Sequence, residues 1–589
     1  MKLWVLLAGL CLPVFCWSQN ILSGPIVGGV TANAASVYLQ TNLPATIEVE
    51  IASDTSFQTS SRFQQTTNEP FGNAVIIPVQ KLEPLTTYFY RIRINDSLQT
   101  GCYQFQTFPA KETNGNFTFT VGACQMRGKD PFSEPIFNVM LKHKPQLFLE
   151  VGDWGYPDTT DLLPDKNTFF PSNLSYLLKY YQKRYSIKEM KALFHSTPVD
   201  YVYDDHDFMN DNSSRNSCSY YHFDGPGDVK EIPNPPGARR NAINGYYHCF
   251  PHYQLPDTSE GIYHSFRAGN CEFFVLDNRS ARSSNLDALV KKGKKYYYRN
   301  VPQHTMLGEK QKQWFLNAIK SSDAHWKFVV SGVNFNHSFR SMITMLEEKK
   351  KPLYNFIIKK VYTKRILTSL VDTWAGFQQE HDEILQFCRE NNIQNVVMLS
   401  GDSHLACLED GAMGALPEMS CGSLSGFFNL QPKFYNYERF NNWNVYMQGM
   451  YNKDYHLAFG KSEVFGADSV RLSVWSSEGK VMGSMTIASG FLPAPTAILQ
   501  NKLKPHRDLH FQVAEANLAY LHLNVKGKTG LFSKLKWEIW NEAGKQVATV
   551  PVQLKKNKQQ IEIQNLPKGN YFVRIQGKDG YFSRRFQKV

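Results

Sequence analysis

An apolar run that ends in Gly-Asp constrains the fold of this chain more than any other segment. Residues 146–151 read Gln-Leu-Phe-Leu-Glu-Val, which is typical of a buried strand, and Gly152 and Asp153 come directly after it. An Asp at the carboxyl end of a buried strand can hold a metal or a phosphate, because open α/β sheets bind ligands at that edge. Tyr156 can turn toward the same point. Since Gly-Asp is also common in ordinary turns, the prediction depends on the residues at the ends of the other strands.

Buried strands and helices alternate from Asn116 to about Ser489. Besides Gln146–Val151, we expect strands at Phe117–Gly122, Cys271–Leu276, Trp326–Ser331 and Asn395–Ser400, and helices at Gly308–Ser321 and Trp374–Asn391. Such alternation predicts an α/β domain, which we assign to residues 115–490.

Segments rich in β-strand patterns flank this region, and 589 residues are too many for one core. Residues 20–110 predict a β-sandwich. Within them, Leu82–Tyr90 resembles the tyrosine corner of a fibronectin type III domain, with a generic hairpin as the alternative. Prolines mark a linker at residues 491–507, and residues 508–589 predict a second, smaller β-sandwich.

The first 18 residues have the pattern of a secretory signal peptide. Lys2 precedes an apolar core from Leu3 to Phe15, and the small residues Cys16 and Ser18 predict cleavage after Ser18. We expect no transmembrane segment in the mature chain, because no other stretch is long and apolar enough. Export permits disulfides, and the eight remaining cysteines lack the spacing of zinc sites.

The charge of the chain favours anionic partners. The formal net charge is +12, which attracts anionic substrates, but no specific nucleic-acid module is recognisable. Lysines cluster at residues 291–295 and at Lys349–Lys351. We expect solvated loops there, and the alternative is a positive rim that attracts phosphate.

Four loops that come after predicted strands carry residues able to bind metals. These are 122–125 with Cys124, 152–156 with Asp153 and Tyr156, 203–212 with Asp205 and His206, and 400–404 with Asp402 and His404. Carboxylates suit Ca²⁺, Mg²⁺ or Mn²⁺, whereas a thiolate and a phenolate suit a more strongly polarising ion such as Fe³⁺. Two cations about 3.5–4 Å apart stabilise the attacking and the leaving oxygen of a displacement at phosphorus. Each loop alone could be an acidic turn, a buried cysteine or a strand cap, but their shared position favours one metal site.

The order of these motifs resembles the calcineurin-like metallophosphatases and, within them, the alkaline phosphatase D (PhoD) family. The resemblance covers about residues 24–489 and includes Leu276–Ser280, Gln313–Leu316, Trp326–Phe328 and Asp372–Phe377. It implies two mixed sheets flanked by helices, preceded by an N-terminal β-sandwich. It also implies a phosphatase in which a metal-activated oxygen attacks a phosphoester substrate.

The resemblance further implies roles for individual residues. The implied metal ligands are Cys124, Asp153, Tyr156, Asp205, Asn212, Asp402 and His404, with Asn210 as an alternative to Asn212. Asp153 would bridge the metals, His206 would donate a proton to the leaving oxygen, and Arg279 would clamp phosphate oxygens. The implied ions are Fe³⁺ and Ca²⁺, with a dinuclear Zn, Mn or Mg centre as the alternative.

This chain differs from the wider superfamily at two positions. Cys124-Gln125 stands where Asp-x-His is usual, and Asp402 stands where a His is usual. Both are features of the PhoD subgroup and argue against a plain two-zinc site. Tyr203 and Asp207 replace the Trp and Glu common in that subgroup, and we expect this to be tolerated. The subgroup's twin-arginine signal is missing, which suggests unfolded export and metal loading outside the cytoplasm.

The tail resembles the type IX secretion sorting domain of Bacteroidetes. The turn from Leu566 to Tyr571 and the basic terminal strand carry this likeness, with a generic β-sandwich as the alternative. It implies export by the type IX secretion machinery to the medium or the cell surface.

Two other functions of the chain stay open: a phosphodiesterase or phospholipase D-like hydrolase of polymeric or lipid phosphodiesters, and an inactive surface binding protein.

Overall fold

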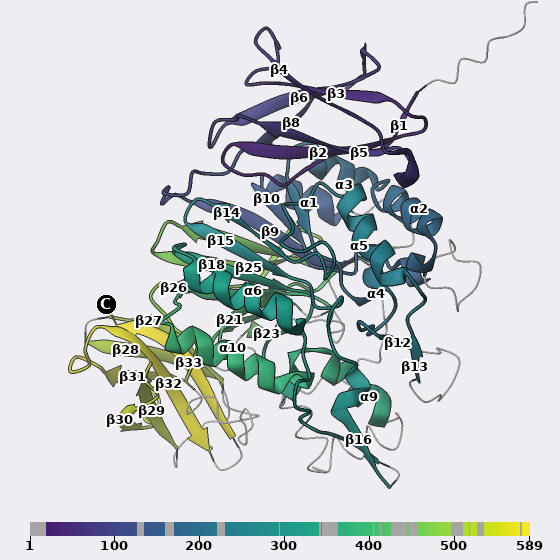
Figure 1. Ribbon diagram of the computed structural model, residues 1–589. Coiled ribbons are helices and arrows are strands. Elements are labelled where there is room, and N and C mark those ends of the chain that lie inside the picture. The colour runs from purple at the N-terminus through teal and green to yellow at the C-terminus, as the bar shows by residue number, and fades with distance from the viewer. Residues whose placement is uncertain are drawn as a thin grey trace, which may run out of the picture.

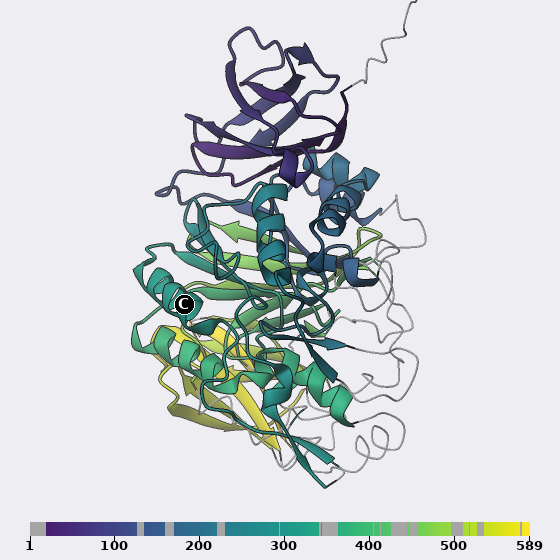
Figure 2. The same ribbon diagram turned by 45° about the vertical axis from the view of Figure 1, so that its right-hand side comes forward.

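The computed structural model describes residues 19–495 and 510–588 with internal gaps, of which the longest span 126–134, 160–169, 221–229, 344–362, 426–444, 447–456 and 527–534. Strands from the N-terminal part lie at one end of the molecule, two larger sheets form its body, and the C-terminal strands lie toward the other end (Figure 1). The view turned by 45° gives the same order (Figure 2). The predicted signal peptide, the Lys349–Lys351 run and residues 496–507 of the predicted linker lie outside the described residues.

Two antiparallel sheets form the N-terminal part. One has the order β1-β2-β5, and the other has the order β4-β3-β6-β7 with β8 beside β6. Their bounds are β1 (Ile21–Gly28), β2 (Ala34–Thr41), β3 (Thr46–Ala52), β4 (Ser61–Thr66), β5 (Ala74–Gln80), β6 (Thr87–Ile94), β7 (Ser97–Leu98) and β8 (Tyr103–Gln106). The Glu83 N–H donates to the Tyr88 hydroxyl at 2.9 Å, as a tyrosine corner requires. The fibronectin type III assignment stays a prediction.

Two mixed sheets form the body, as the resemblance implies. The first has the order β11-β10-β9-β24-β25-β26 with β22 beside β9, and the second has the order β14-β15-β18-β19-β21-β20-β23. The first comprises β9 (Phe117–Gln125), β10 (Leu147–Glu150), β11 (Val199–Tyr201), β22 (Ser423–Ser425), β24 (Ala458–Phe465), β25 (Ser469–Ser476) and β26 (Val481–Ala488). The second comprises β14 (His264–Ala268), β15 (Cys271–Leu276), β18 (Trp326–Ser331), β19 (Val396–Ser400), β20 (Cys407–Asp410), β21 (Pro417–Ser420) and β23 (Val445–Tyr446).

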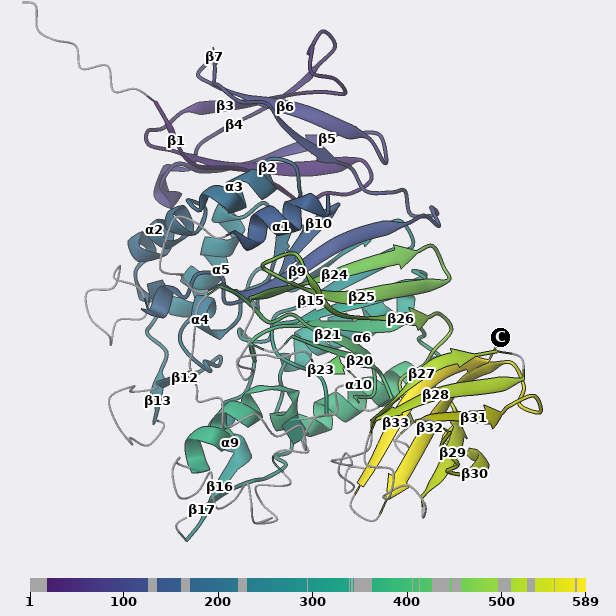
Figure 3. The same ribbon diagram turned by 180° about the vertical axis from the view of Figure 1, so that it is seen from behind.

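The core lies between these sheets. The Phe119 ring of the first sheet packs 5.1 Å from Phe273 and 5.0 Å from Phe328 of the second. Apolar side chains of α1 (Ile136–Lys142), α2 (Leu174–Arg184), α3 (Lys188–Phe194) and α5 (Ala238–Cys249) join the same cluster. A separate cluster joins the second sheet to α6 (Gly308–Ser321) and α10 (Gln378–Glu390). The result is a pair of sheets with helices on its outer faces; Figure 3 shows β24 and β25 beside β9.

The predicted helix at Trp374–Asn391 is interrupted in the structure. A 3₁₀ turn at Trp374–Gly376 comes after α9 (Thr363–Asp372), and α10 begins only at Gln378. The Thr373 side chain caps the turn, and a Cβ at Gly376 would lie 2.0 Å from the Val371 carbonyl oxygen. This close approach fixes a bend that helical periodicity alone does not indicate.

The C-terminal part also forms two antiparallel sheets around its own core. Their orders are β27-β28-β31 and β30-β29-β32-β33. The bounds are β27 (His510–Ala516), β28 (Tyr520–Lys526), β29 (Lys536–Asn541), β30 (Gln546–Pro551), β31 (Lys558–Glu562), β32 (Gly569–Gly577) and β33 (Gly580–Lys588). Leu521, Trp537 and Ile561 lie in this core, and the Tyr571 hydroxyl donates to the Pro567 carbonyl at 2.8 Å.

The described part also contains two short hairpins and several cysteines. The hairpins are β12 (Ser217–Tyr220) with β13 (Lys230–Pro233), and β16 (Leu289–Lys292) with β17 (Lys295–Tyr298), where Lys291 and Lys292 are exposed. The cysteines of the described part carry free thiols. Within the same part, no helix has both the length and the apolar character that crossing a membrane requires.

Candidate metal centre

Parallel strands bring the predicted loops to one edge of the sheets. In the first sheet β10 lies between β9 and β11, all parallel, so the loops after these strands meet. Short α4 (Asp205–Phe208) opens the loop after β11, and β19 of the second sheet leads into Asp402. The backbone φ lies between 46° and 61° at five residues of these loops: Cys124, Asp153, Tyr156, Asp402 and His404. Left-handed backbone is uncommon at non-glycine residues, and its clustering in these neighbouring loops is typical of a functional site.

Gly152 lets two of these loops approach each other. Its φ is 94°, and a Cβ at this position would lie 2.4 Å from the Cβ of Asp204. Glycine is therefore required at position 152 for two reasons: its positive φ, and the close approach of the loop that carries Asp204.

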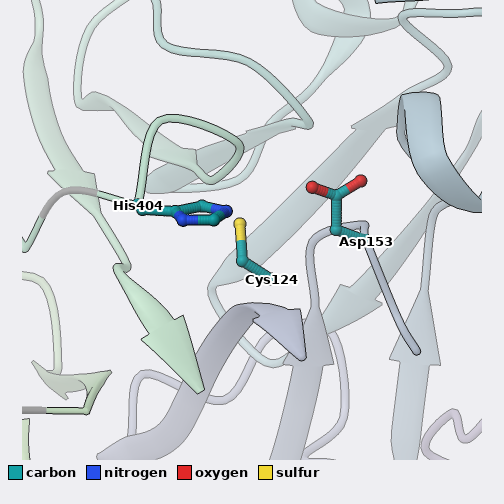
Figure 4. A group of neighbouring side chains, drawn as sticks. All are labelled: Cys124, Asp153 and His404. Atoms are coloured by element: carbon teal, nitrogen blue, oxygen red, sulfur yellow. The ribbon is translucent and has the colours of Figure 1, made fainter. Parts of the chain in front are cut away.

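Four of the predicted ligands meet in one group. The sulfur of Cys124, a carboxylate oxygen of Asp153 and a ring nitrogen of His404 lie within 4.8 Å of one another. Figure 4 shows the sulfur of Cys124 between the His404 ring and the Asp153 carboxylate. The Tyr156 hydroxyl lies 3.0 Å from Oδ2 of Asp153 and 2.8 Å from Nε2 of His404. A thiol, a phenol, an imidazole and a carboxylate could together hold a transition-metal ion.

A second group consists of carboxylates. Oxygens of Asp153, Asp204, Asp205 and Asp402 lie within 4.8 Å of one another. Asp153 belongs to both groups, and also to a third with Asp205 and His206. Its Oδ2 lies 3.0 Å from the Tyr156 hydroxyl, and its Oδ1 accepts the His206 N–H at 3.3 Å. The two oxygens thus contact different loops, which would suit a carboxylate shared between two cations.

The electrostatics of the site fit bound cations. Burial raises the pKa values of Asp153 and Asp402 well above their usual range, and neighbouring carboxylates raise them further. Burial and then Asp153 raise the pKa of the Cys124 thiol in the same way. Burial lowers the pKa of His404 to about 4, so its ring is neutral and able to bind a metal. Cations would offset the repulsion among these groups, so the donor set fits metal ions.

The His206 ring packs beside the Tyr156 ring. The two ring centroids are 4.2 Å apart, and Nδ1 of His206 lies 2.7 Å from Oδ2 of Asp158. Burial lowers the pKa of His206, but the carboxylates of Asp158, Asp205 and Asp153 more than offset it, so the pKa is raised well above its usual value. The imidazolium form can donate a proton.

Arg279 lies in the same region, but its donors are already engaged. Its side chain is fully buried, and its guanidinium bonds Asp204 at 2.5 and 2.9 Å and Asp372 at 2.8 and 3.0 Å. Nη2 also lies 3.9 Å from Asp205 and 4.0 Å from Asp402. The predicted phosphate clamp stays a prediction, and it would require Arg279 to leave one carboxylate.

The loop after β11 contains residues of the candidate metal centre that the sequence predicted and one, Asp204, that it did not. The Asn212 N–H donates to Oδ2 of Asp205 at 2.5 Å, whereas Oδ1 of Asn210 accepts the Asp211 N–H. Sequence reasoning did not select Asp204, although the Asp204-Asp205 doublet was a usable signal. Asp158 was also missed, because its pairing with His206 depends on the three-dimensional arrangement.

A separate histidine group joins the segment after β18 to α10. His337, His381 and Asp382 bring ligand atoms within 4.8 Å of one another. The guanidinium of Arg340 bonds Asp382 at 3.0 Å and lies 3.4 Å from Nδ1 of His381. Because Arg340 already balances the Asp382 carboxylate, we interpret this group as an ion-pair cluster.

Comparison with known proteins identifies the family. A family model described as PhoD-like phosphatase matches residues 119–474, which is more than half of the chain. This chain belongs to the PhoD-like phosphatase family. Alkaline phosphatase D of Bacillus subtilis (strain 168) is 25% identical over 373 residues, and the match covers 61% of this chain and 58% of that protein. The chain therefore matches less than two thirds of that relative's length.

A solved structure of PhoD shares the fold. The TM-score is 0.59 at 18% sequence identity, with 79% of this chain and 92% of that chain covered. Residues 519–588 match a secretion system C-terminal sorting domain, and residues 18–111 match a domain of unknown function, DUF7800. The sorting domain points to secretion and surface localisation, which agrees with the prediction from the sequence of the C-terminal tail.

Proposed function

We propose that this chain is a secreted metal-dependent phosphoric ester hydrolase of the alkaline phosphatase D type. The observation that carries the proposal is the position of Asp153 in both donor groups, beside Cys124 and beside the other carboxylates. Membership of the PhoD-like phosphatase family supports the same activity. We also propose the signal peptide at 1–18 and the domain boundaries predicted from the sequence.

We assign the metal ligands in two sets. Cys124, Tyr156, Asp153 and His404 would hold Fe³⁺, because thiolate, phenolate and imidazole suit a polarising transition metal. Asp153, Asp205, Asn212 and Asp402 would hold Ca²⁺ through oxygen ligands, with Asp204 as an additional candidate. When bound, these cations supply Lewis acidity and charge neutralisation for displacement at phosphorus.

The protein's own residues provide proton transfer and charge balance. Asp158 orients the His206 ring through Nδ1, and Nε2, which lies 3.7 Å from Oδ1 of Asp211, would donate a proton to the leaving oxygen. Arg279 balances the charge of Asp204 and Asp372 and thereby keeps two acidic loops together. The left-handed backbone at Asp153 and Tyr156 fixes both side chains before substrate arrives.

Replacement of Asp153 tests the proposal. We expect Asp153→Ala to lose at least about 100-fold of p-nitrophenyl phosphate hydrolysis, because it removes a residue common to both donor groups. Asp323→Ala is the matched control, since its side chain is 63% exposed and pairs with Lys111. Metal content should fall in the first variant and stay at the parental value in the second. Full hydrolysis by Asp153→Ala with metals still bound would contradict the proposal.

A phosphodiesterase is the second candidate. The exposed Lys291 and Lys292 of the β16–β17 hairpin lie 5.8 and 5.7 Å from the rings of Tyr296 and Tyr297, a combination that suits a polymeric phosphodiester. Rates on a monoester and on a bis-ester of the same chromogenic alcohol separate the two activities. A higher kcat/KM for the bis-ester would favour the diesterase.

A further inference from the structure

One buried carboxylate, Asp207, accepts hydrogen bonds from both of the loops that carry Asp153 and Asp205. Its Oδ1 accepts the backbone N–H groups of Asp153 at 3.2 Å and of Asp204 at 2.6 Å. Its Oδ2 accepts the Trp154 N–H at 3.1 Å and the Tyr201 hydroxyl at 2.5 Å. One side chain therefore bonds the loop after β10, the loop after β11 and strand β11 itself.

A buried arginine from a distant segment balances this carboxylate. Nη2 of Arg184, at the end of α2, lies 3.7 Å from Oδ2 of Asp207, and both side chains are fully buried. The Arg184 guanidinium lies between 4.4 and 4.7 Å from the ring centroids of Trp154, Tyr180, Tyr181 and Tyr201. It also donates to the Tyr201 hydroxyl at 3.0 Å. Aromatic faces stabilise a desolvated cation, so Arg184 keeps its charge away from water.

We propose that Arg184 and Asp207 are positioning residues for the metal centre, with Arg184 acting through Asp207 on the backbone of Asp153. The proposal rests on the proposed function, because the centre that they position is the one assigned there. Neither side chain is assigned as a metal ligand. Their effect is on the geometry of Asp153, whose φ of 60° the Asp207 bond to its amide helps to hold.

The proposal also assigns a role to helix α2. This helix ends with Arg184, the cation that lies beside Asp207 and therefore close to the loop after β10. A carboxylate with four donors and one cation forms a rigid support, and such outer partners typically change metal affinity about 10- to 100-fold when removed.

Amide hydrogen exchange in the metal-free full-length protein provides the first test. We expect Arg184→Met to accelerate exchange in a peptide covering residues 147–156. The Asp207 carboxylate would lose its neighbouring cation, and its hydrogen bonds from the Asp153 and Trp154 amides would weaken. His264→Gln is the matched control, since it alters another buried side-chain contact with a carboxylate, that of His264 Nε2 with Asp200 at 3.0 Å. Equal exchange of this peptide in Arg184→Met and in the parent would overturn the proposal.

Metal affinity provides the second test. We expect Arg184→Met and Asp207→Asn to weaken Ca²⁺ binding at least about 10-fold, whereas Asp207→Glu, which keeps the carboxylate, recovers most of it. At saturating metal, kcat should fall while KM for p-nitrophenyl phosphate stays within about twofold. If Arg184→Met does not fold, Arg184→Lys decides, since lysine keeps the charge but loses the planar contact with the aromatic rings.

The outcomes separate this inference from the proposed function. Failure of the parental protein to hydrolyse any phosphoester would refute the function, while the exchange and affinity measurements still test the positioning role. Parental metal affinity in Arg184→Met, together with a melting temperature lowered as much as in His264→Gln, would show a purely structural ion pair and overturn the inference.

Discussion

Gly152 occupies the most restricted backbone position of the metal centre. An alanine would add the cost of a left-handed φ and a 2.4 Å contact with the Asp204 side chain. We expect Gly152→Ala to lower the free energy of unfolding by about 2–4 kcal/mol. Differential scanning calorimetry of the metal-free protein measures the change.

Gly237 is the matched control for this prediction. Its φ is 78°, but no atom lies within 4 Å of a Cβ placed there. Gly237→Ala should therefore cost only about 1 kcal/mol, the cost of the backbone conformation alone. Equal losses in the two variants would show that the approach of the Asp204 loop does not matter.

Cys124 and Tyr156 distinguish this centre from one built of carboxylates and histidines. If both bind ferric iron, the purified protein should absorb visible light through charge transfer from sulfur and phenolate. We expect Cys124→Ser to shift or abolish this band and to lower iron content. Cys271→Ser makes the same change at a buried position of β15, and it should leave the band unchanged. A colourless parent that contains no iron would contradict the assignment.

At the scale of elements, Glu50 joins three strands of the N-terminal part. It lies opposite Arg62 of β4 and Arg91 of β6, with ion-pair distances of 3.2 and 2.7 Å. Hydrogen bonding from Arg91 is the main cause that lowers the pKa of Glu50 from 4.5 to about 2, against the opposing effect of burial. Because the folded pKa is depressed, the stabilisation is complete above pH 4.5 and is lost as pH falls toward 2.

We therefore expect Glu50→Gln to destabilise the N-terminal part by about 2 kcal/mol at pH 7, a value reduced for screening of the partly exposed arginines. The difference from the parent should shrink as pH falls from 4.5 to 2. Urea unfolding followed at several pH values measures it. A difference that does not vary over this range would refute the assigned ion pairs.

The sequence predicted elements best where burial is uniform. Cys271–Leu276 and Trp326–Ser331 are strands with the predicted bounds, because each is mostly apolar and buried, with Phe273–Leu276 and Phe328–Val330 as apolar runs. The break before Gln378 was not predictable, since it depends on the contact of Gly376 with Val371. The order of motifs likewise led to the grouping of Cys124 with Asp153, whose roles stay predictions. The support from Arg184 to Asp207 carries no sequence signal, because it joins residues that only the folded chain brings together.

At the scale of the whole molecule, the sorting domain contacts the body directly. The Asn570 side chain donates to the Gly490 carbonyl, and Nη2 of Arg585 donates to the Leu492 carbonyl at 3.0 Å. Phe572 joins the apolar cluster of the second sheet together with Ala494. Other contacts reach the body itself: Arg389 of α10 donates to the Glu542 carbonyl at 2.7 Å, and the Arg585 N–H donates to Asp410 of β20 at 3.2 Å. The proposed ligands lie instead in the loops after β9, β10, β11 and β19.

This separation predicts that the sorting domain is needed for delivery and not for chemistry. We expect a chain ending at residue 495 to keep its kcat for p-nitrophenyl phosphate within about twofold. Its melting temperature should fall by a few degrees, since Phe491 and Ala494 lose apolar cover worth about 1–2 kcal/mol. In the native host, the truncated protein should stay inside the cell envelope, which fractionation measures. A truncated enzyme that loses activity while retaining its metals would show that the contact between the domains shapes the site.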